Sequence, residues 1–159
     1  MEKKQNLSDY DPLNLPDVSG KKIVVVTAEW NFEITSSMQK ACIKTLTEHG
    51  IAPDDIINIY AAGSFELPFA AKESLLKHRA DAAVCIGCII QGETRHFDFI
   101  AQATANGIMQ VGLECRKPVI FGVLTTDTMQ QAVDRSGGKH GNKGTEAAIA
   151  CLKLLALSS

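Results

Sequence analysis

The chain lacks the features that mark several large classes of protein. Its formal net charge is −2, which argues against a nucleic-acid binder that relies on bulk positive charge. No apolar stretch combines the length and the freedom from charge that a membrane span needs. The segment Met1–Asn6 has no apolar core of the kind found in a signal peptide. We therefore expect a cytoplasmic protein whose partners include neither nucleic acid nor a membrane.

The cysteines form no pattern that predicts disulfide bonds or catalysis. They are five in number and irregularly spaced, which does not look like a disulfide framework. Cys85 and Cys88 match CxxC, but the pair lies inside an apolar strand run, and no second CxxC completes a zinc site. We expect buried core thiols. The cysteines are Cys42, Cys85, Cys88, Cys115 and Cys151.

Two further signatures are missing. No group of histidines and carboxylates has the spacing of metal ligands, so we predict no metal. Gly87 and Gly92 do not complete GxGxxG, so the fingerprint of a dinucleotide site is absent. The sequence therefore predicts neither a metal site nor a dinucleotide site.

The chain does have enough apolar residues for one core. It has 159 residues, of which 45% are hydrophobic, and this suits a single compact domain. Residues 1–21 are polar and carry Pro12 and Pro16, which predicts an extended arm before a domain over residues 22–159.

Apolar strand patterns alternate with helical patterns along that domain. This alternation predicts a four-stranded parallel sheet with helices on both faces, a three-layer αβα sandwich. Residues 127 and 130 look like a capping pair for the fourth helix, and residues 137–141 look like a flexible break. The expected strands are 23–27, 56–60, 82–90 and 119–124, and the expected helices are 34–46, 69–78, 97–113, 127–135 and 145–157.

Chemistry-bearing residues follow the third strand. Gly92-Glu93-Thr94-Arg95-His96-Phe97 comes directly after it, and open α/β sheets bind ligands at the carboxyl ends of their strands. His96 stands near a helix amino terminus, whose dipole disfavours a charged imidazole and leaves a base for proton transfer. The other interpretation is a capping or surface histidine. Gly92–Thr94 could bind phosphate through amides and a hydroxyl.

Other strand ends allow both structural and functional interpretations. Trp30 could stack on a flat heterocycle or cover the sheet edge. Gly63–Pro68 could hold a ligand or form an ordinary turn, with Glu66 favouring the helix start. Arg135 could bind phosphate through its planar fork or stabilise a helix end, and Lys143 is equally ambiguous.

Five segments keep a common order and spacing from about Lys21 to Leu157, and together they resemble the lumazine synthase family of the riboflavin pathway. One such motif would be weak, whereas five collinear motifs are strong. The segments are Trp30–Thr35, Gly63–Lys72, Gly87–Phe99, Pro118–Thr126 and Gly141–Gly144.

The resemblance implies a flavodoxin-like fold and a transferase that needs no cofactor. The family condenses 5-amino-6-(D-ribitylamino)uracil with 3,4-dihydroxy-2-butanone 4-phosphate, giving 6,7-dimethyl-8-ribityllumazine and phosphate in the penultimate step of riboflavin synthesis. Imine formation, phosphate elimination and ring closure lead to the product.

The resemblance also implies a role for each candidate residue. Trp30 would stack on the pyrimidine, and His96 would shuttle protons. Phe121 and Arg135 would come from a neighbouring subunit, with Arg135 and Lys143 on the phosphate. Ser64, Phe65 and Glu66 would hold the ribityl chain and the ring edge. The backbone of Cys88, Ile89 and Ile90 would line the ring pocket, and the backbone amides of Glu93 and Thr94 would bind the phosphate.

The resemblance finally implies assembly. The family forms homopentamers, and some members pack twelve of them into a 60-subunit icosahedral capsid. Riboflavin synthase is a further partner implied by the family, and the arm before Lys21 could add a strand to a neighbour. Two alternatives remain: a non-catalytic flavin- or lumazine-binding or shell protein using the same pocket, and an unrelated flavodoxin-like binding domain.

Overall fold

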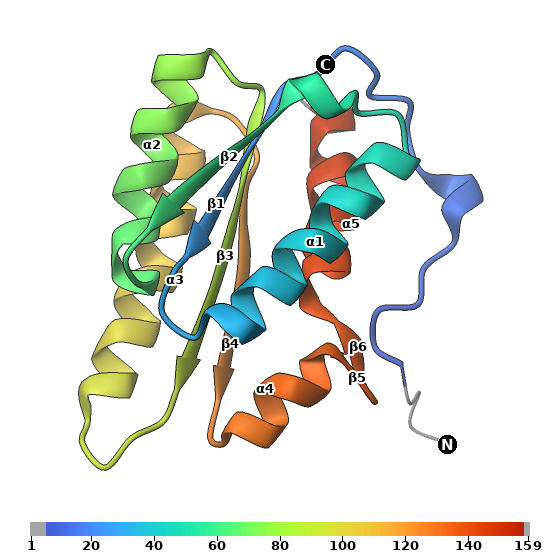
Figure 1. The fold of residues 1–159 in the computed structure, drawn as a ribbon. Coiled ribbons are helices and arrows are strands. Elements are labelled where there is room, and N and C mark those ends of the chain that lie inside the picture. Colours follow the sequence, from blue (N-terminus) through green and yellow to red (C-terminus); the bar gives the residue numbers. More distant parts are fainter. Residues whose placement is uncertain (1–5, 158–159) are drawn as a thin grey trace.

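Four parallel strands form the central sheet of the computed structural model, which describes residues 6–157 (Figure 1). In space the strands follow the order β2-β1-β3-β4, so β2 and β4 are the edges. The predicted parallel sheet is confirmed, and each strand contains the run expected for it. The strands are β1 (Ile23–Ala28), β2 (Ile56–Ala61), β3 (Ala82–Ile90) and β4 (Val119–Thr126).

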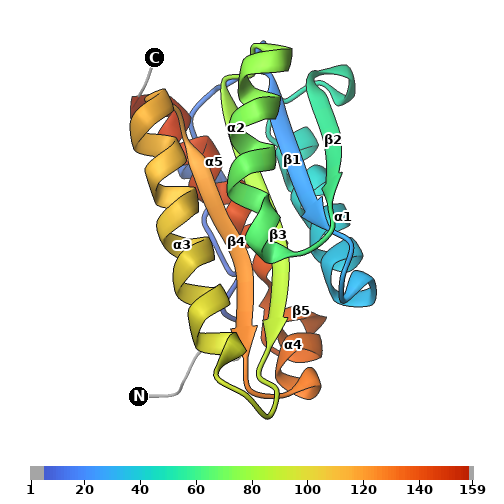
Figure 2. The same ribbon diagram turned by 90° about the vertical axis from the view of Figure 1, so that its left-hand side faces the viewer.

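Helices cover both faces of this sheet. Two of them pack together on one face and two on the other, giving the three layers that the sequence predicts (Figure 2). The first pair is α1 (Phe32–Glu48) with α5 (Lys143–Leu157), and the second is α2 (Leu67–His78) with α3 (His96–Cys115). The short α4 (Met129–Arg135) and three 3-10 turns, η1 (Pro12–Asn14), η2 (Pro53–Asp55) and η3 (Ser64–Glu66), complete the chain together with a small hairpin.

Strand β1 explains why both faces need cover. Its side chains are all buried, and successive ones point to opposite faces. Val25 joins the core under α1 and α5, whereas Val24 and Val26 join the core under α2 and α3. A continuous β-branched run is therefore stable here only because both faces of the sheet are covered.

Gly107 does not interrupt α3, although glycine has a low helix propensity. A Cβ at this position would lie 2.7 Å from Cγ of Pro68 at the start of α2. The glycine therefore lets α2 and α3 approach closely, and the packing offsets the propensity cost.

The predicted cap of α4 is wrong. The helix is capped one residue later than predicted, because the Thr128 hydroxyl accepts from the backbone N–H of Gln131 at 3.1 Å. Gln131 in turn accepts from the N–H of Asp127 at 2.8 Å, so Asp127 and Gln130 are not the capping pair. Thr128 is the residue in extended conformation, and the cap forms there.

The expected flexible break is an ordered hairpin. Strands β5 (Ser136–Gly138) and β6 (Gly141–Asn142) pair antiparallel, and Gly137 and Gly141 have φ angles of 113° and 90°. Strands of two and three residues are too short to show an alternation of apolar and polar residues in the sequence. Asn142 then accepts from the N–H of Gly144 at 2.8 Å, so α5 begins two residues before the expected Thr145.

Gly144 is where α5 crosses closest to α1. A Cβ there would overlap the carbonyl group of Met38, which is backbone and cannot rotate away. We expect Gly144→Ala to lower the free energy of unfolding by about 1–3 kcal/mol, which is the usual cost of overpacking a tight contact.

Urea denaturation would measure this loss. Gly92→Ala is the matched control, because a Cβ at Gly92 meets nothing within 4 Å. Equal midpoints for the two variants would contradict the assigned contact.

The arm lies back on its own chain. Val18 is buried, and the Tyr10 hydroxyl is 2.9 Å from Nε2 of His49 at the end of α1. The turn η1 interrupts the otherwise extended course, and residues 1–5 lie outside the described part. The arm's pairing with a neighbour stays a prediction. Between residues 6 and 157, no helix is long and apolar enough to cross a bilayer.

Candidate functional site

The carboxyl ends of β1, β2 and β3 meet at one edge of the sheet. The chain leaves β1 for α1 on one face and leaves β3 for α3 on the other, so the crevice between these strands is a topological switch point. Open α/β sheets bind ligands at such crevices.

A cavity of about 390 Å³ opens at this edge. Four separate segments contribute to it: the turn after β1, the turn η3, the end of β3 and the first turns of α3. The lining residues are Trp30, Asn31, Ser64, Phe65, Glu66, Cys88, Ile89, Ile90, His96 and Ile100. Most of the residues predicted for the ring and ribityl positions therefore lie around one space.

Trp30 forms an exposed aromatic wall of the cavity. Its side chain is 66% exposed, and its backbone N–H donates to the carbonyl of Ala62 at 3.0 Å. A Cβ at Gly63 would lie 2.5 Å from the indole, so the glycine lets the ring rest on the backbone. The ring is held in place from one side and is free to stack on a ligand.

Ser64 brings a buried hydroxyl without a partner to this cavity. The residue is 7% exposed, and its Oγ has no hydrogen bond within the described chain. A Cβ at Gly87 would lie 2.5 Å from that oxygen, so Gly87 makes room for it. An unsatisfied buried hydroxyl is costly, so this turn holds an unpaired polar group directly behind the cavity wall.

Glu66 supports both interpretations given to it. Its Oε2 accepts from the N–H of Gly63 at 3.1 Å, which is the ordinary turn-stabilising role. The same side chain lines the cavity, so its other oxygen remains available there.

His96 is the first residue of α3 and is exposed at the cavity. Its backbone N–H donates to Oγ1 of Thr94 at 3.3 Å, which places the ring at the start of the helix. No side-chain hydrogen bond fixes the imidazole among residues 6–157, so both ring nitrogens can serve a ligand. Glu93 and Thr94 are exposed in the preceding loop and do not line the cavity.

Cys88 carries a buried thiol at the cavity wall. Burial raises the pKa of its thiol to about 11, so the thiol stays protonated. Its backbone carbonyl accepts from Nδ2 of Asn31 at 3.0 Å. Burial likewise raises the pKa of Cys85 to about 12. The described cysteines are all free, and no metal-binding group of His, Cys, Asp and Glu occurs in residues 6–157.

Two cavity residues escaped the sequence analysis. Asn31 has a left-handed backbone with φ of 58°, and its side chain ties the end of β1 to the end of β3. Asparagine is the residue type that tolerates this conformation, and that was the available signal. Ile100 lies one helical turn after His96, so helical spacing would have placed it on the same face.

The proposed phosphate cation lies away from this cavity within one chain. Arg135 ends α4, and its Nη2 is 2.8 Å from Oε2 of Glu146. Lys143 lies on the same side, with Nζ 3.9 Å from Oε1 of Glu146.

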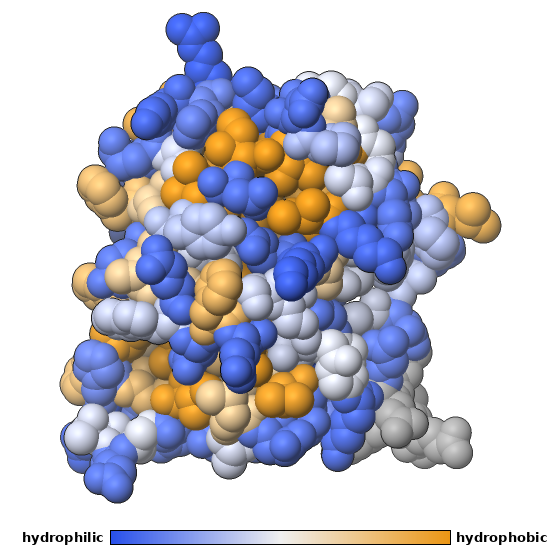
Figure 3. Space-filling view, viewed as in Figure 1, coloured by the Kyte–Doolittle hydropathy of each residue, from blue (hydrophilic) through white to orange (hydrophobic). Residues whose placement is uncertain are grey.

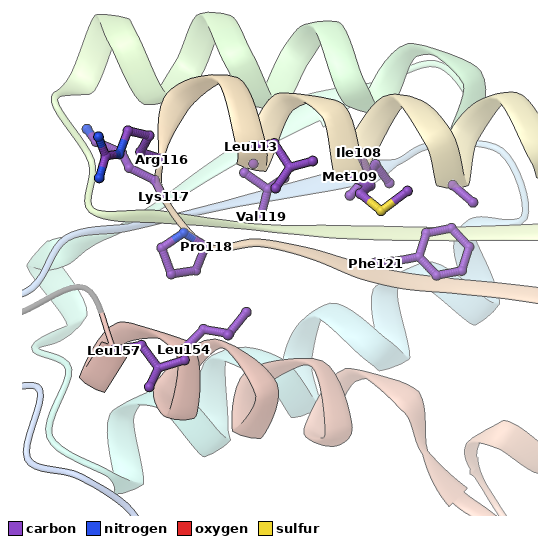
Figure 4. Close-up of a pocket in the computed structure, with 12 residues that line it drawn as sticks. Ile108, Met109, Leu113, Arg116, Lys117, Pro118, Val119, Phe121, Leu154 and Leu157 are labelled. Carbon is purple, nitrogen blue, oxygen red and sulfur yellow. The ribbon is translucent and has the colours of Figure 1, made fainter.

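Phe121 lies on another surface. It borders an apolar groove of about 410 Å³ between α3, α5 and the edge strand β4 (Figure 4). A single chain therefore does not bring Phe121, Arg135 or Lys143 to the cavity.

Comparison with known proteins gives one consistent result. Residues 20–159 match the model of the 6,7-dimethyl-8-ribityllumazine synthase family. A protein of that name from Cytophaga hutchinsonii is 51% identical over 152 residues, covering 96% of this chain and 95% of the relative. Those from Porphyromonas gingivalis (49% identity; 96% and 94% coverage) and Parabacteroides distasonis (44%; 98% and 97%) are also similar.

Proposed function

The chain belongs to the 6,7-dimethyl-8-ribityllumazine synthase family, and from this premise we propose that its cavity condenses ribitylaminouracil with butanone phosphate. It is a transferase of riboflavin biosynthesis. The products are 6,7-dimethyl-8-ribityllumazine and phosphate. The relatives carry the name of an enzyme, and this gives no support to a non-catalytic flavin-binding or shell role.

One observation carries the assignment of the reaction to this cavity. An aromatic platform (Trp30), an unsatisfied hydroxyl (Ser64) and an unrestrained imidazole (His96) line the same space. Its volume of about 390 Å³ lies within the roughly 300–1,000 Å³ of small-molecule sites. A flat ring, a polyol chain and a proton-transfer step match these three groups.

The other residues proposed for the site bind the remaining parts of the two substrates. The ribityl chain and the ring edge lie against Ser64, Phe65 and Glu66. The backbone of Cys88, Ile89 and Ile90 lines the ring pocket. The amides of Glu93 and Thr94 face the phosphate at the mouth of the cavity. Because the butanone substrate carries its own leaving group, the reaction needs proximity, proton transfer and charge stabilisation rather than a redox cofactor.

Mixing both substrates with pure protein tests the proposal. We expect the fluorescence of the lumazine to rise together with free phosphate, and neither signal when one substrate is omitted. Binding of flavin or lumazine without any turnover would instead favour a carrier.

A second copy of this chain must complete the site, and we propose a homopentamer. The groove of Figure 4 is bordered by exposed apolar side chains of α3 and α5, with Leu113 74% and Leu157 81% exposed. Apolar patches also interrupt the polar surface on the face of α1 and β2 (Figure 3). Burying these surfaces against a neighbour would bring Phe121 and Arg135 to another chain's cavity.

Light scattering after size exclusion tests the assembly. We expect a pentamer or a larger particle, and electron microscopy would reveal a 60-subunit shell. A catalytically active monomer at working concentration would rule out the shared site. The cytoplasmic location and a riboflavin synthase partner stay predictions.

Trp30 should report directly on binding. It is the sole tryptophan of the chain, so quenching of intrinsic fluorescence by a flavin or lumazine has one source. We expect Trp30→Ala to weaken binding by about 1–3 kcal/mol, by analogy with base–aromatic stacking. Phe69→Ala is a control, since it removes an exposed ring that does not line the cavity. Unchanged affinity in Trp30→Ala would place the indole outside the site.

A further inference from the structure

We infer that the N-terminal arm is a positioning element of the phosphate site: Leu7 and Ser8 hold the two acceptors that orient the guanidinium of Arg135. The inference rests on the proposed function, because it assumes that Arg135 binds the phosphate of the substrate.

The guanidinium of Arg135 has two acceptors within its own chain. Nη2 contacts the Glu146 carboxylate, at 3.1 Å from Oε1 and 2.8 Å from Oε2, and Nη1 donates to the carbonyl of His140 at 3.0 Å. The Arg135 side chain is only 19% exposed, so these contacts define its direction. An arginine has five N–H donors, and these contacts use at most three. At least two remain for a phosphate.

The arm binds both of those acceptors. The Leu7 N–H donates to the carbonyl of His140 at 3.2 Å, which is the same oxygen that accepts from Arg135. The Ser8 hydroxyl lies 3.0 Å from Oε2 of Glu146 and 2.9 Å from the carbonyl of Asn142. Its single proton can be donated to only one of them, and the charged carboxylate is the stronger acceptor.

Gly141 and Asn142 form the surface against which Ser8 packs. The Asn142 N–H donates to Oγ of Ser8 at 2.7 Å, which directs the hydroxyl proton toward its acceptors. A Cβ at Gly141 would lie 2.5 Å from that oxygen, and the φ of 90° independently favours glycine. The Gly141-Asn142 motif therefore serves the arm as well as the hairpin.

The arm affects Arg135 mainly through the carboxylate of Glu146. It lies between two cations, Arg135 and Lys143, both assigned to the phosphate. A carboxylate that rotated freely could follow either cation or approach the anionic substrate. Ser8 restrains one carboxylate oxygen, which keeps the carboxylate paired with Arg135 and the remaining guanidinium donors in one direction.

The test is the Ser8→Ala variant of the full chain. A hydrogen bond to a charged group contributes about tenfold or more, but Ser8 acts on the phosphate only through Glu146 and Arg135. We therefore expect a smaller effect, about a three- to tenfold rise in KM for the butanone phosphate. The KM for the pyrimidine should stay unchanged. The dissociation constant of inorganic phosphate, titrated alone, should rise by the same factor.

The matched control is Ser19→Ala, which removes an exposed arm serine that hydrogen-bonds Asp17 through its backbone and its hydroxyl. It should behave as wild type. Equal increases in both substrate KM values, or a Ser8→Ala variant that differs from wild type only in melting temperature, would overturn the inference.

A double-mutant cycle separates positioning from general stability. If Ser8 acts through Arg135, Ser8→Ala should have no further effect on phosphate binding in an Arg135→Ala background. Additive effects would overturn the inference. Absence of lumazine formation by the wild type would refute the proposed function alone, because the phosphate titrations would still decide the role of the arm. A wild type that binds no phosphate would overturn that role.

Discussion

The His96→Ala variant is expected to lose about 10²-fold in kcat while it still assembles and binds flavin. General acid–base catalysis contributes about 10²–10⁴-fold, and the lower end applies here because the exposed imidazole leaves room for water to replace it. Steady-state kinetics at several neutral pH values, with light scattering for assembly, measures both properties.

Another histidine provides the control for this loss. His78 is the last residue of α2 and does not line the cavity, so His78→Ala should retain the wild-type rate. His96→Gln keeps a polar side chain but no titratable nitrogen, and it should stay close to His96→Ala. A full wild-type rate in His96→Ala across neutral pH would remove the imidazole from the mechanism.

The Arg135→Ala variant is expected to lose about ten- to a hundredfold in specificity for the butanone phosphate. A charge-assisted hydrogen bond contributes roughly 1.5–3 kcal/mol, and the phosphate is the only part of either substrate that carries such charge. Specificity for the pyrimidine should change far less. Kinetics with each substrate varied in turn separates the two effects.

Arg135→Lys should recover only part of the loss. Lysine keeps the charge but not the planar fork, and it cannot bridge both Glu146 and the His140 carbonyl in the same way. Lys153→Ala, which removes an exposed cation of α5, is a control for net charge. Equal losses for both substrates with intact assembly would mean that Arg135 only stabilises the end of α4.

The sheet was predictable from the sequence because its two central strands, β1 and β3, are buried on both faces. The runs 23–28 and 82–90 contain no charge, and such runs have few alternatives to a covered parallel strand. The rule that ligands bind at strand carboxyl ends then placed Trp30, Ser64 and His96 together, and they line one cavity. Their catalytic roles remain predictions.

Short-range geometry was not predictable. The hairpin of residues 136–142 depends on positive φ angles at Gly137 and Gly141, and a five-residue glycine-rich segment is equally compatible with disorder. Asn31 was missed because its hydrogen bond to Cys88 joins residues 57 positions apart. The tight crossing at Gly144 likewise depends on the path of α1, which the local sequence does not encode.

The contact between the arm and the hairpin also sets an order of events during synthesis. Ser8 accepts a hydrogen bond from Asn142, a residue 134 positions later, so this contact closes a very long loop. The cavity walls end at Ile100, whereas Glu146 leaves the ribosome later than every residue of those walls. Leu7 and Ser8 are made before the residues of the hairpin and α5 that they contact, and a chain cut short before residue 140 lacks those partners. The guanidinium of Arg135 thus reaches its final orientation only after Glu146 has been made and the arm has docked.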